Sequence, residues 1–158
     1  MAKLGPRRQS QRGQALIEFA LIVPVLFIII FIVVDVALML DRWVVINNAA
    51  REAARVGAVG ASASQIQLRA IGTSQDLLSE PDAEIDIKWN DANANGHGDP
   101  GESVVVNVSY CYDLLSPIAR IIPGRGDGCP RGSIKMRACS DMRLEQGVDG
   151  IATGGACP

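Results

Sequence analysis

Histidine and aromatic residues are scarce in this sequence. His97 is the single histidine among 158 residues, and aromatic side chains make up 4% of the chain. Catalytic sites of the Ser/His/Asp or Cys/His type rely on histidine, as do most sites in which a metal activates water. His97 has no second histidine and no cysteine near it in sequence, which argues against a catalytic base or a zinc ligand. The four cysteines also lack the Cys-x-x-Cys spacing of zinc sites. We therefore expect a protein that is not an enzyme.

Charge is nearly absent from residues 15–34. Glu18 is the only ionisable side chain among these 20 residues. A helix of this length spans about 30 Å, which is the thickness of the hydrocarbon core of a bilayer. An ordinary soluble domain is thereby excluded. A secretory signal peptide does not fit either, because its apolar core is shorter and ends at a small-residue cleavage site. Residues 14–35 are therefore predicted to form a transmembrane helix.

Acidic residues are missing from residues 1–13, which hold four of the 15 basic residues: Lys3, Arg7, Arg8 and Arg12. All 17 acidic residues lie in the remainder of the chain. By the positive-inside rule, the basic flank keeps the N-terminus in the cytoplasm and sends the C-terminal part across the membrane. We expect a single-pass protein of the cytoplasmic membrane with its C-terminal domain outside. An acidic remainder gives no support for binding to nucleic acid.

The helical pattern continues beyond the apolar run. Neither Gly nor Pro interrupts the sequence between Pro24 and Gly57, so one helix is predicted to run to about Gly57. Asp35 and Trp43 fit the outer membrane interface, where charges and amphipathic rings settle. Pro24 is compatible with a harmless kink or with a functional hinge. The predicted segments are a basic leader at 1–13, the transmembrane helix at 14–35, the outer half of the same helix at 36–60, and an extracytoplasmic domain at 61–158.

The start of the apolar run reads Arg12-Gly-Gln-Ala-Leu-Ile-Glu-Phe19. This segment resembles the processing site of type IV-like prepilins, in which a peptidase cuts after a glycine that follows a basic leader. The resemblance implies that a prepilin peptidase removes the leader after Gly13 and leaves Gln14 as the new N-terminus. Glu18 is then the fifth mature residue. Its carboxylate, in this chain or a neighbouring one, can pair with the new α-ammonium group and so reduce the cost of burying either charge. By position alone, Glu18 could instead reach back to the membrane interface.

A second segment, Asn48-Ala-Ala-Arg-Glu-Ala-Ala-Arg55, sharpens the resemblance. Together with the processing site it is similar to the TadE-like family, minor pseudopilins of the tight adherence (Tad) pilus. The similarity covers residues 12–57, extends loosely to 134–145, and is absent from 62–133. It implies a pilus-associated structural subunit that is needed for pilus assembly and that contacts other pilin or pseudopilin subunits through its N-terminal helix. The alternative is a permanently anchored extracytoplasmic binding module with a calcium-stabilised loop.

The part outside the membrane is predicted to be small and α+β. Ser64 and Gln67 have capping-box spacing, which predicts a short helix from Gln65 to about Leu78. Alternating apolar residues predict strands at 84–89, 103–110 and 133–145. A three-stranded sheet needs a cover over its apolar face, and the outer half of the long helix can supply it through Ala49, Ala50, Ala53 and Ala54. The residues predicted to face inward are Ile85, Ile87, Trp89, Val104, Val106, Val108, Tyr110, Ile134, Met136, Ala138 and Met142.

The segment between the first two strands fits the spacing of a twelve-residue calcium loop. Gly96 is placed for the sharp turn and His97 for a backbone carbonyl ligand. The same residue types are also those of an ordinary polar hairpin loop, so both interpretations stay open. The predicted side-chain ligands are Asp91, Asn93, Asn95, Asp99 and Glu102.

The cysteines all lie in the C-terminal half, which is predicted to be outside, where disulfides form and persist. We prefer the pairs Cys111–Cys129 and Cys139–Cys157, because each closes a short Gly/Pro-rich loop. The second choice pairs Cys111 with Cys139 across the exposed sheet face. The apolar segment 113–124 either covers an edge of the core, rests on the membrane or meets a partner. The Arg125-Gly-Asp127 tripeptide resembles an adhesion motif but is too short to carry an argument.

Overall fold

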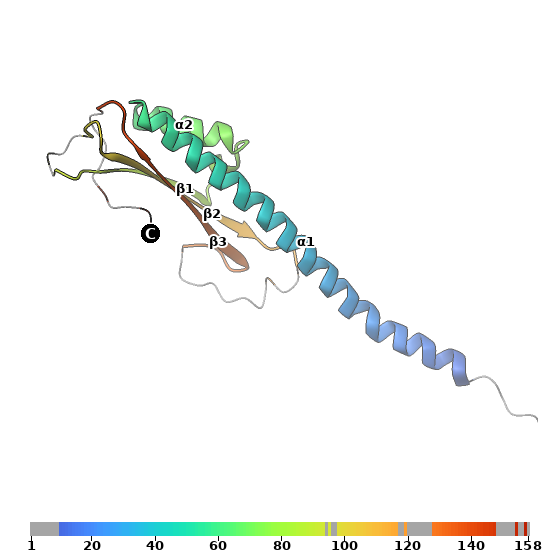
Figure 1. Cartoon of the computed structure of the whole chain (residues 1–158). Helices are drawn as coiled ribbons and strands as arrows, with labels where there is room; N and C mark the ends of the chain where they lie inside the picture. Colours follow the sequence, from blue (N-terminus) through green and yellow to red (C-terminus); the bar gives the residue numbers. More distant parts are fainter. Residues whose placement is uncertain are drawn as a thin grey trace, which may run out of the picture.

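The computed structural model describes residues 10–93, 95, 98–116, 119, 128–147, 154 and 157. A single long helix, α1 (Ser10–Ala58), lies with its C-terminal half on one face of a sheet, and its N-terminal half projects away from the domain (Figure 1). The other elements are α2 (Ala63–Thr73), the 3₁₀ turn η1 (Leu77–Ser79), β1 (Ala83–Asn90), β2 (Ser103–Asp113) and β3 (Ser133–Arg143). The predictions for Gly96, for His97 and for most of 117–127, including Arg125-Gly-Asp127, concern residues outside the described ones.

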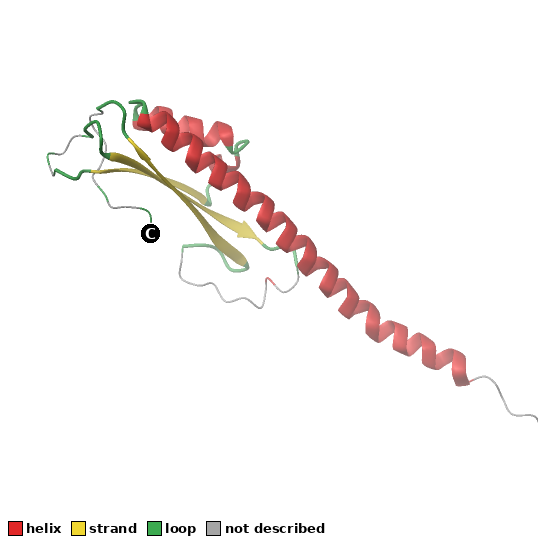
Figure 2. Ribbon diagram, in the orientation of Figure 1, coloured by secondary structure: helices red, strands yellow, loops and turns green. Residues whose placement is uncertain are grey.

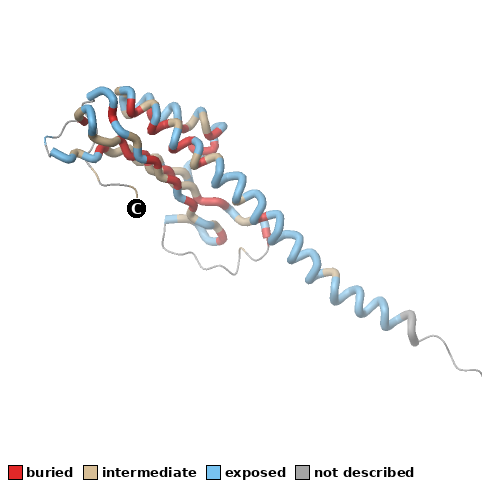
Figure 3. Tube along the Cα trace, viewed as in Figure 1, coloured by how far each residue is buried: buried red, intermediate tan, exposed pale blue. Residues whose placement is uncertain are grey.

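The length of α1 confirms the prediction of one continuous helix. Its 49 residues correspond to about 74 Å. Pro24 lies inside the helix without ending it. Within residues 13–34 every residue except Val23 is exposed, whereas beyond residue 45 the helix buries one side against the sheet (Figure 3). The small alanines decide this difference, because they let the helix approach the sheet closely.

The sheet is antiparallel with the strand order β1-β2-β3, so the α+β prediction is confirmed (Figure 2). The central strand pairs Val108 with Ile85 on one side and with Ala138 on the other. Side chains alternate between the two faces of a strand, so this register places the predicted apolar residues toward α1. The strand ends differ slightly from the predicted ones. β1 is one residue longer at each end, β2 continues beyond 110 to Asp113, and β3 ends at Arg143 rather than at 145.

The core lies between α1, α2 and the sheet. Ala53 and Ala54 of α1 have no exposed surface, and neither have Val104 and Val106 of β2. Gly57 shows how close the elements are: a Cβ built there would lie 3.0 Å from Ile66 Cδ1 and 3.2 Å from Val104 Cγ2. Trp89 fills the largest buried volume of the core.

Four local predictions are corrected by the structure. The N-cap of α2 is Ser62 rather than Ser64, and the Gln65 side chain accepts a hydrogen bond from the Ser62 backbone N–H at 3.0 Å. The helix also ends at Thr73, because the chain turns through positive φ two residues later, at Gln75 and Asp76. Ile134 is 37% exposed, since it lies at the end of β3 where the cover is incomplete. Cys111 points to the outer face of the sheet but is buried, so this face is partly covered.

Candidate functional site

The predicted processing segment forms the first turns of α1. Gly13 is exposed, and a Cβ built on it would meet nothing within 4 Å. The Gln14 side chain donates a hydrogen bond from Nε2 to Glu18 Oε1 at 3.1 Å. Positions four apart lie on the same face of a helix. The first and fifth residues of the predicted mature chain are therefore neighbours one turn apart, close to the peptide bond between Gly13 and Gln14.

The helix beyond this turn presents large apolar side chains to its surroundings. By length and composition, the segment Gly13–Ala58 is apolar enough to cross a membrane. Very little of this apolar surface is covered by the described part of the chain. Exposed apolar surface of this extent needs a nonaqueous partner, such as lipid or another helix. The exposed side chains include Leu16, Ile17, Phe19, Leu21, Ile22, Leu26, Phe27, Ile30, Phe31, Val33 and Leu40.

Asp35 has a role that the sequence analysis missed. Its side chain is only 3% exposed. The backbone N–H of Leu115 donates to Asp35 Oδ1 at 2.9 Å, and that of Ser116 donates to Oδ2 at 3.0 Å. Hydrogen bonds to a charged acceptor are stronger than neutral ones and offset part of the cost of its burial. Asp35 thus holds the segment after β2 against α1. The one sequence signal was a lone acid directly after the apolar run.

The outer part of α1 is linked to α2 by an ion-pair cluster. Glu52 accepts hydrogen bonds from Arg55 Nη2 at 2.9 Å and from Arg69 Nη2 at 2.6 Å. Arg55 lies one turn further along α1, whereas Arg69 belongs to α2. The hydrogen bonds from Arg55 and then Arg69 lower the pKa of Glu52 to about 2. The same contact raises the pKa of Arg55. The cluster orients α2 over α1.

The predicted calcium loop is folded as a hydrogen-bonded turn. Glu102 uses both carboxylate oxygens, accepting from the backbone N–H of Ala92 at 2.9 Å and of Asp99 at 3.0 Å. Asn93 and Asn95 each donate a side-chain N–H to Asp99 Oδ2. The loop therefore brings four of its predicted ligands into one hydrogen-bonded unit. Within the described residues, no group of three or more His, Cys, Asp or Glu side chains is arranged to hold a metal.

The fifth predicted ligand belongs to the same turn. Asp91 Oδ1 accepts a hydrogen bond from the backbone N–H of Asn95 at 3.2 Å. That N–H also donates to Asn93 Oδ1 at 3.0 Å. Side-chain oxygens at both ends of the loop, from Asp91 and Glu102, thus accept hydrogen bonds from backbone N–H groups within the loop. Gly96 and His97 lie outside the described residues.

Two disulfides join the pairs preferred from the loop lengths, Cys111–Cys129 and Cys139–Cys157, each 18 residues apart in sequence. The second ties the C-terminal segment to β3. Gly154 ties the same segment to β1, because its backbone N–H donates to the carbonyl of Trp89 at 2.9 Å.

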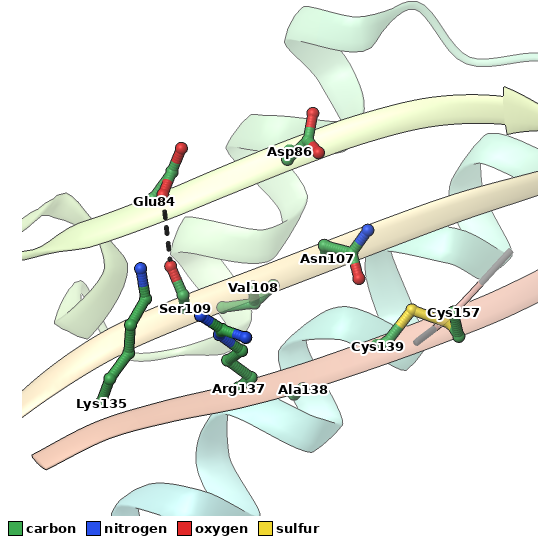
Figure 4. A pocket seen from close by; sticks show the side chains of 10 residues that line it. All are labelled: Glu84, Asp86, Asn107, Val108, Ser109, Lys135, Arg137, Ala138, Cys139 and Cys157. Carbon is green, nitrogen blue, oxygen red and sulfur yellow. Dashed lines mark hydrogen bonds between the residues drawn. A yellow bond between two sulfur atoms is a disulfide. The ribbon is translucent and has the colours of Figure 1, made fainter. Parts of the chain in front are cut away.

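The sheet face opposite α1 is hollowed and polar (Figure 4). The hollow has a volume of about 550 Å³. Glu84 and Asp86 reach it from β1, whereas Lys135 and Arg137 reach it from β3, with Ser109 of β2 between them. Acidic and basic groups thus lie on opposite sides of an open surface. Such a surface can bind a polar partner, but it does not enclose a reacting group.

Comparison with known proteins gives a family match for the N-terminal part of the chain. Residues 13–55 match the model of a family described as TadE-like protein. No curated protein and no solved structure shows a significant match to the chain. The predicted resemblance to this family is confirmed over nearly the range expected, residues 12–57. The matched segment contains Gly13, Gln14, Glu18 and Asp35 and ends before α2.

Proposed function

We propose, from the TadE-like character of residues 13–55, that this protein is a membrane-anchored pseudopilin-like subunit needed for assembly of a tight adherence pilus. The observation that carries the proposal is the exposed apolar half of α1, which begins with the contact between Gln14 and Glu18. A structural subunit needs such a surface, because it exchanges lipid neighbours for the helices of other subunits.

The topology follows from the charges and the cysteines. Residues 1–13 form a cytoplasmic leader that a prepilin peptidase removes after Gly13. Residues 14–35 span the cytoplasmic membrane, and residues 36–158 lie outside it. Two disulfides in the domain support an oxidising compartment on that side. Gly13 is exposed near the start of α1, which supports access of a peptidase to the bond that follows it.

Cleavage changes the electrostatics of the first helical turn. A carboxylate at the bilayer centre costs about 2.5–3.5 kcal/mol, and less toward the edge. In the uncut chain, the Gln14 amide partly satisfies Glu18. After cleavage, Gln14 also carries an α-ammonium group within reach of the same face. This charge can pair with Glu18 of its own chain or of a neighbouring subunit, and the intermolecular pair would set the register between subunits.

The proposal is tested first on the N-terminus. Mass spectrometry of the protein purified from membranes should find a mature chain that begins at Gln14. The variant Glu18→Ala should still be cleaved but should support fewer pili. Glu145→Ala is the matched control, since Glu145 is an exposed glutamate outside α1, and it should assemble normally. A chain that retains its arginine-rich leader in cells would refute the processing step, and normal piliation by Glu18→Ala would refute the ion pair.

The second candidate is a permanently anchored binding module with a calcium-stabilised loop. It is favoured by the carboxylates of Asp91 and Glu102, which lie at the two ends of the loop and both accept hydrogen bonds from backbone N–H groups within it. An intact leader together with calcium-dependent protection of the loop against proteolysis would support this candidate over the first. A mature N-terminus at Gln14 with no effect of calcium would exclude it.

A further inference from the structure

We infer that the segment Leu114–Ser116 rests on the bilayer, as a second membrane contact beside α1. The partner is the boundary between the acyl chains and the headgroups of the phospholipids on the outer side. This inference rests on the proposed membrane span at residues 14–35. It adds that the folded domain lies directly against the lipid surface, held there by Asp35.

The depth of this segment follows from its contact with α1. The apolar run ends at Val34, and 20 residues of helix match a hydrocarbon core of about 30 Å. Asp35 therefore lies at the outer boundary of the hydrocarbon. The backbone N–H groups of Leu115 and Ser116 lie 2.9 and 3.0 Å from its carboxylate oxygens. A segment held this close to Asp35 must share its depth.

The side chains at this depth suit a lipid neighbour. Leu115 is 67% exposed, and Ile134, which lines one groove together with Leu114 and Ser116, is 37% exposed. Exposing these two apolar side chains to water is unfavourable, whereas contact with acyl chains is favourable. An open apolar groove of about 280 Å³ lies between α1 and this end of the domain. Its lining residues are Ile32, Asp35, Val36, Met39, Leu114, Ser116 and Ile134.

The polarity changes in the direction expected of an interface. Trp43 lies eight residues beyond Asp35, which places it about 12 Å further from the hydrocarbon. It lines a second groove together with Leu40 and the basic residues Lys135 and Arg137. Tryptophan and basic side chains are characteristic of the headgroup layer. The apolar groove and the tryptophan-containing groove thus follow each other as acyl chains and headgroups do.

The hydrogen bonds to Asp35 also give the polar groups at this boundary their partners. Irregular backbone and carboxylates are both expensive beside hydrocarbon unless they are hydrogen-bonded. Here each satisfies the other, since the carboxylate accepts from two backbone N–H groups. The segment can therefore lie at the boundary with its polar groups paired and the Leu115 side chain directed outward.

The test uses tryptophan reporters in the full chain, reconstituted in phosphatidylcholine vesicles with bromine on the upper acyl chain. Trp43→Phe removes the exposed native tryptophan, while Trp89 stays buried in the core. Leu115→Trp is then compared with Leu68→Trp, since Leu68 is equally exposed at 69% but lies on α2. Emission from the Leu115→Trp reporter should fall by roughly half, as expected for an indole at the interface, and the Leu68→Trp reporter should not respond. Equal emission changes at the two sites would overturn the inference.

Two further variants test the membrane span and the role of Asp35 separately. A Phe27→Trp reporter in the same Trp43→Phe background should be quenched by bromine deep in the acyl chains. If Phe27→Trp is quenched and Leu115→Trp is not, the second contact fails while the span stands. If Phe27→Trp is not quenched, the span itself fails, and with it the proposed function. Adding Asp35→Ala should reduce quenching of the Leu115→Trp reporter to the level at Leu68, and undiminished quenching would refute the role of Asp35.

Discussion

Two helical glycines offer a sharp test of how closely α1 packs on the domain. A Cβ at Gly57 would lie 3.0 Å from Ile66 Cδ1 and 3.2 and 3.3 Å from the two methyl carbons of Val104. A Cβ at Gly72 of α2 would meet nothing within 4 Å. We therefore expect Gly57→Ala and Gly72→Ala to change the free energy of unfolding in opposite directions, although both replace glycine by the best helix former.

The magnitudes follow from two opposing terms. Replacing a helical glycine by alanine stabilises by about 0.5–1 kcal/mol when the new methyl group meets open space. Gly72→Ala should show this gain. At Gly57 the same gain is opposed by overpacking, which costs about 1–3 kcal/mol. The Ile66 methyl group is the end of a flexible side chain and can rotate, but Val104 is β-branched and fully buried. The net result should be a loss of about 1 kcal/mol.

The assay is thermal unfolding of the full chain in detergent, followed by near-ultraviolet circular dichroism. For a domain of about 100 residues, 1 kcal/mol corresponds to roughly 4–8 °C in Tm. Gly72→Ala should raise Tm and Gly57→Ala should lower it. If Gly57→Ala raises Tm as much as Gly72→Ala does, the close approach of α1 to β2 and α2 is wrong.

Three further outcomes are expected. The pKa of Glu52 is about 2 in the folded protein against 4.5 ordinarily, so its stabilising effect is complete above pH 4.5 and declines as the pH falls toward 2. Glu52→Gln should remove this part of the pH dependence of Tm, and an unchanged profile would contradict the contacts of Glu52 with Arg55 and Arg69. If the loop binds calcium, millimolar calcium, the range of extracellular calcium modules, should raise Tm, and Glu102→Gln should abolish the effect. No shift in the wild-type chain would reject the site. Replacing Cys139 and Cys157 by serine should cost about 3 kcal/mol, as expected for a loop of this length, and loss of less than a third of that in denaturant titration would show that the segment is held by other contacts.

The long helix and the sheet could be predicted because their signals are local. An apolar run sets the length of a span, and alternation along a strand sets its inward face, whatever lies elsewhere in the chain. The alanines of α1 pointed to a close helix–sheet contact for the same reason. The position of α2 was predicted only approximately, because Ser62 and Ser64 both fit a helix start and the positive φ at Gln75 has no sequence signature.

In the candidate site, too, the local contacts could be predicted from the sequence and the long-range contacts could not. The contact between Gln14 and Glu18 spans one helical turn, so the spacing alone placed these side chains together. The ion pair between Glu52 and Arg69 joins two helices, and no spacing rule predicts it from the sequence. The burial of Cys111 was mispredicted, because alternation assigns a residue to a face without telling whether another segment covers that face.

The sequence by itself determined that one helix is long and apolar enough to cross a membrane, that its first turn resembles a processing site, and that a small sheet with paired cysteines follows. The tertiary structure decided where the domain stands along that helix. Asp35 and Leu115 are 80 residues apart, and only folding brings the carboxylate to the backbone N–H groups. Such a contact depends on how the sheet between the two residues packs on α1, whereas a helix or strand pattern depends only on near neighbours in the chain.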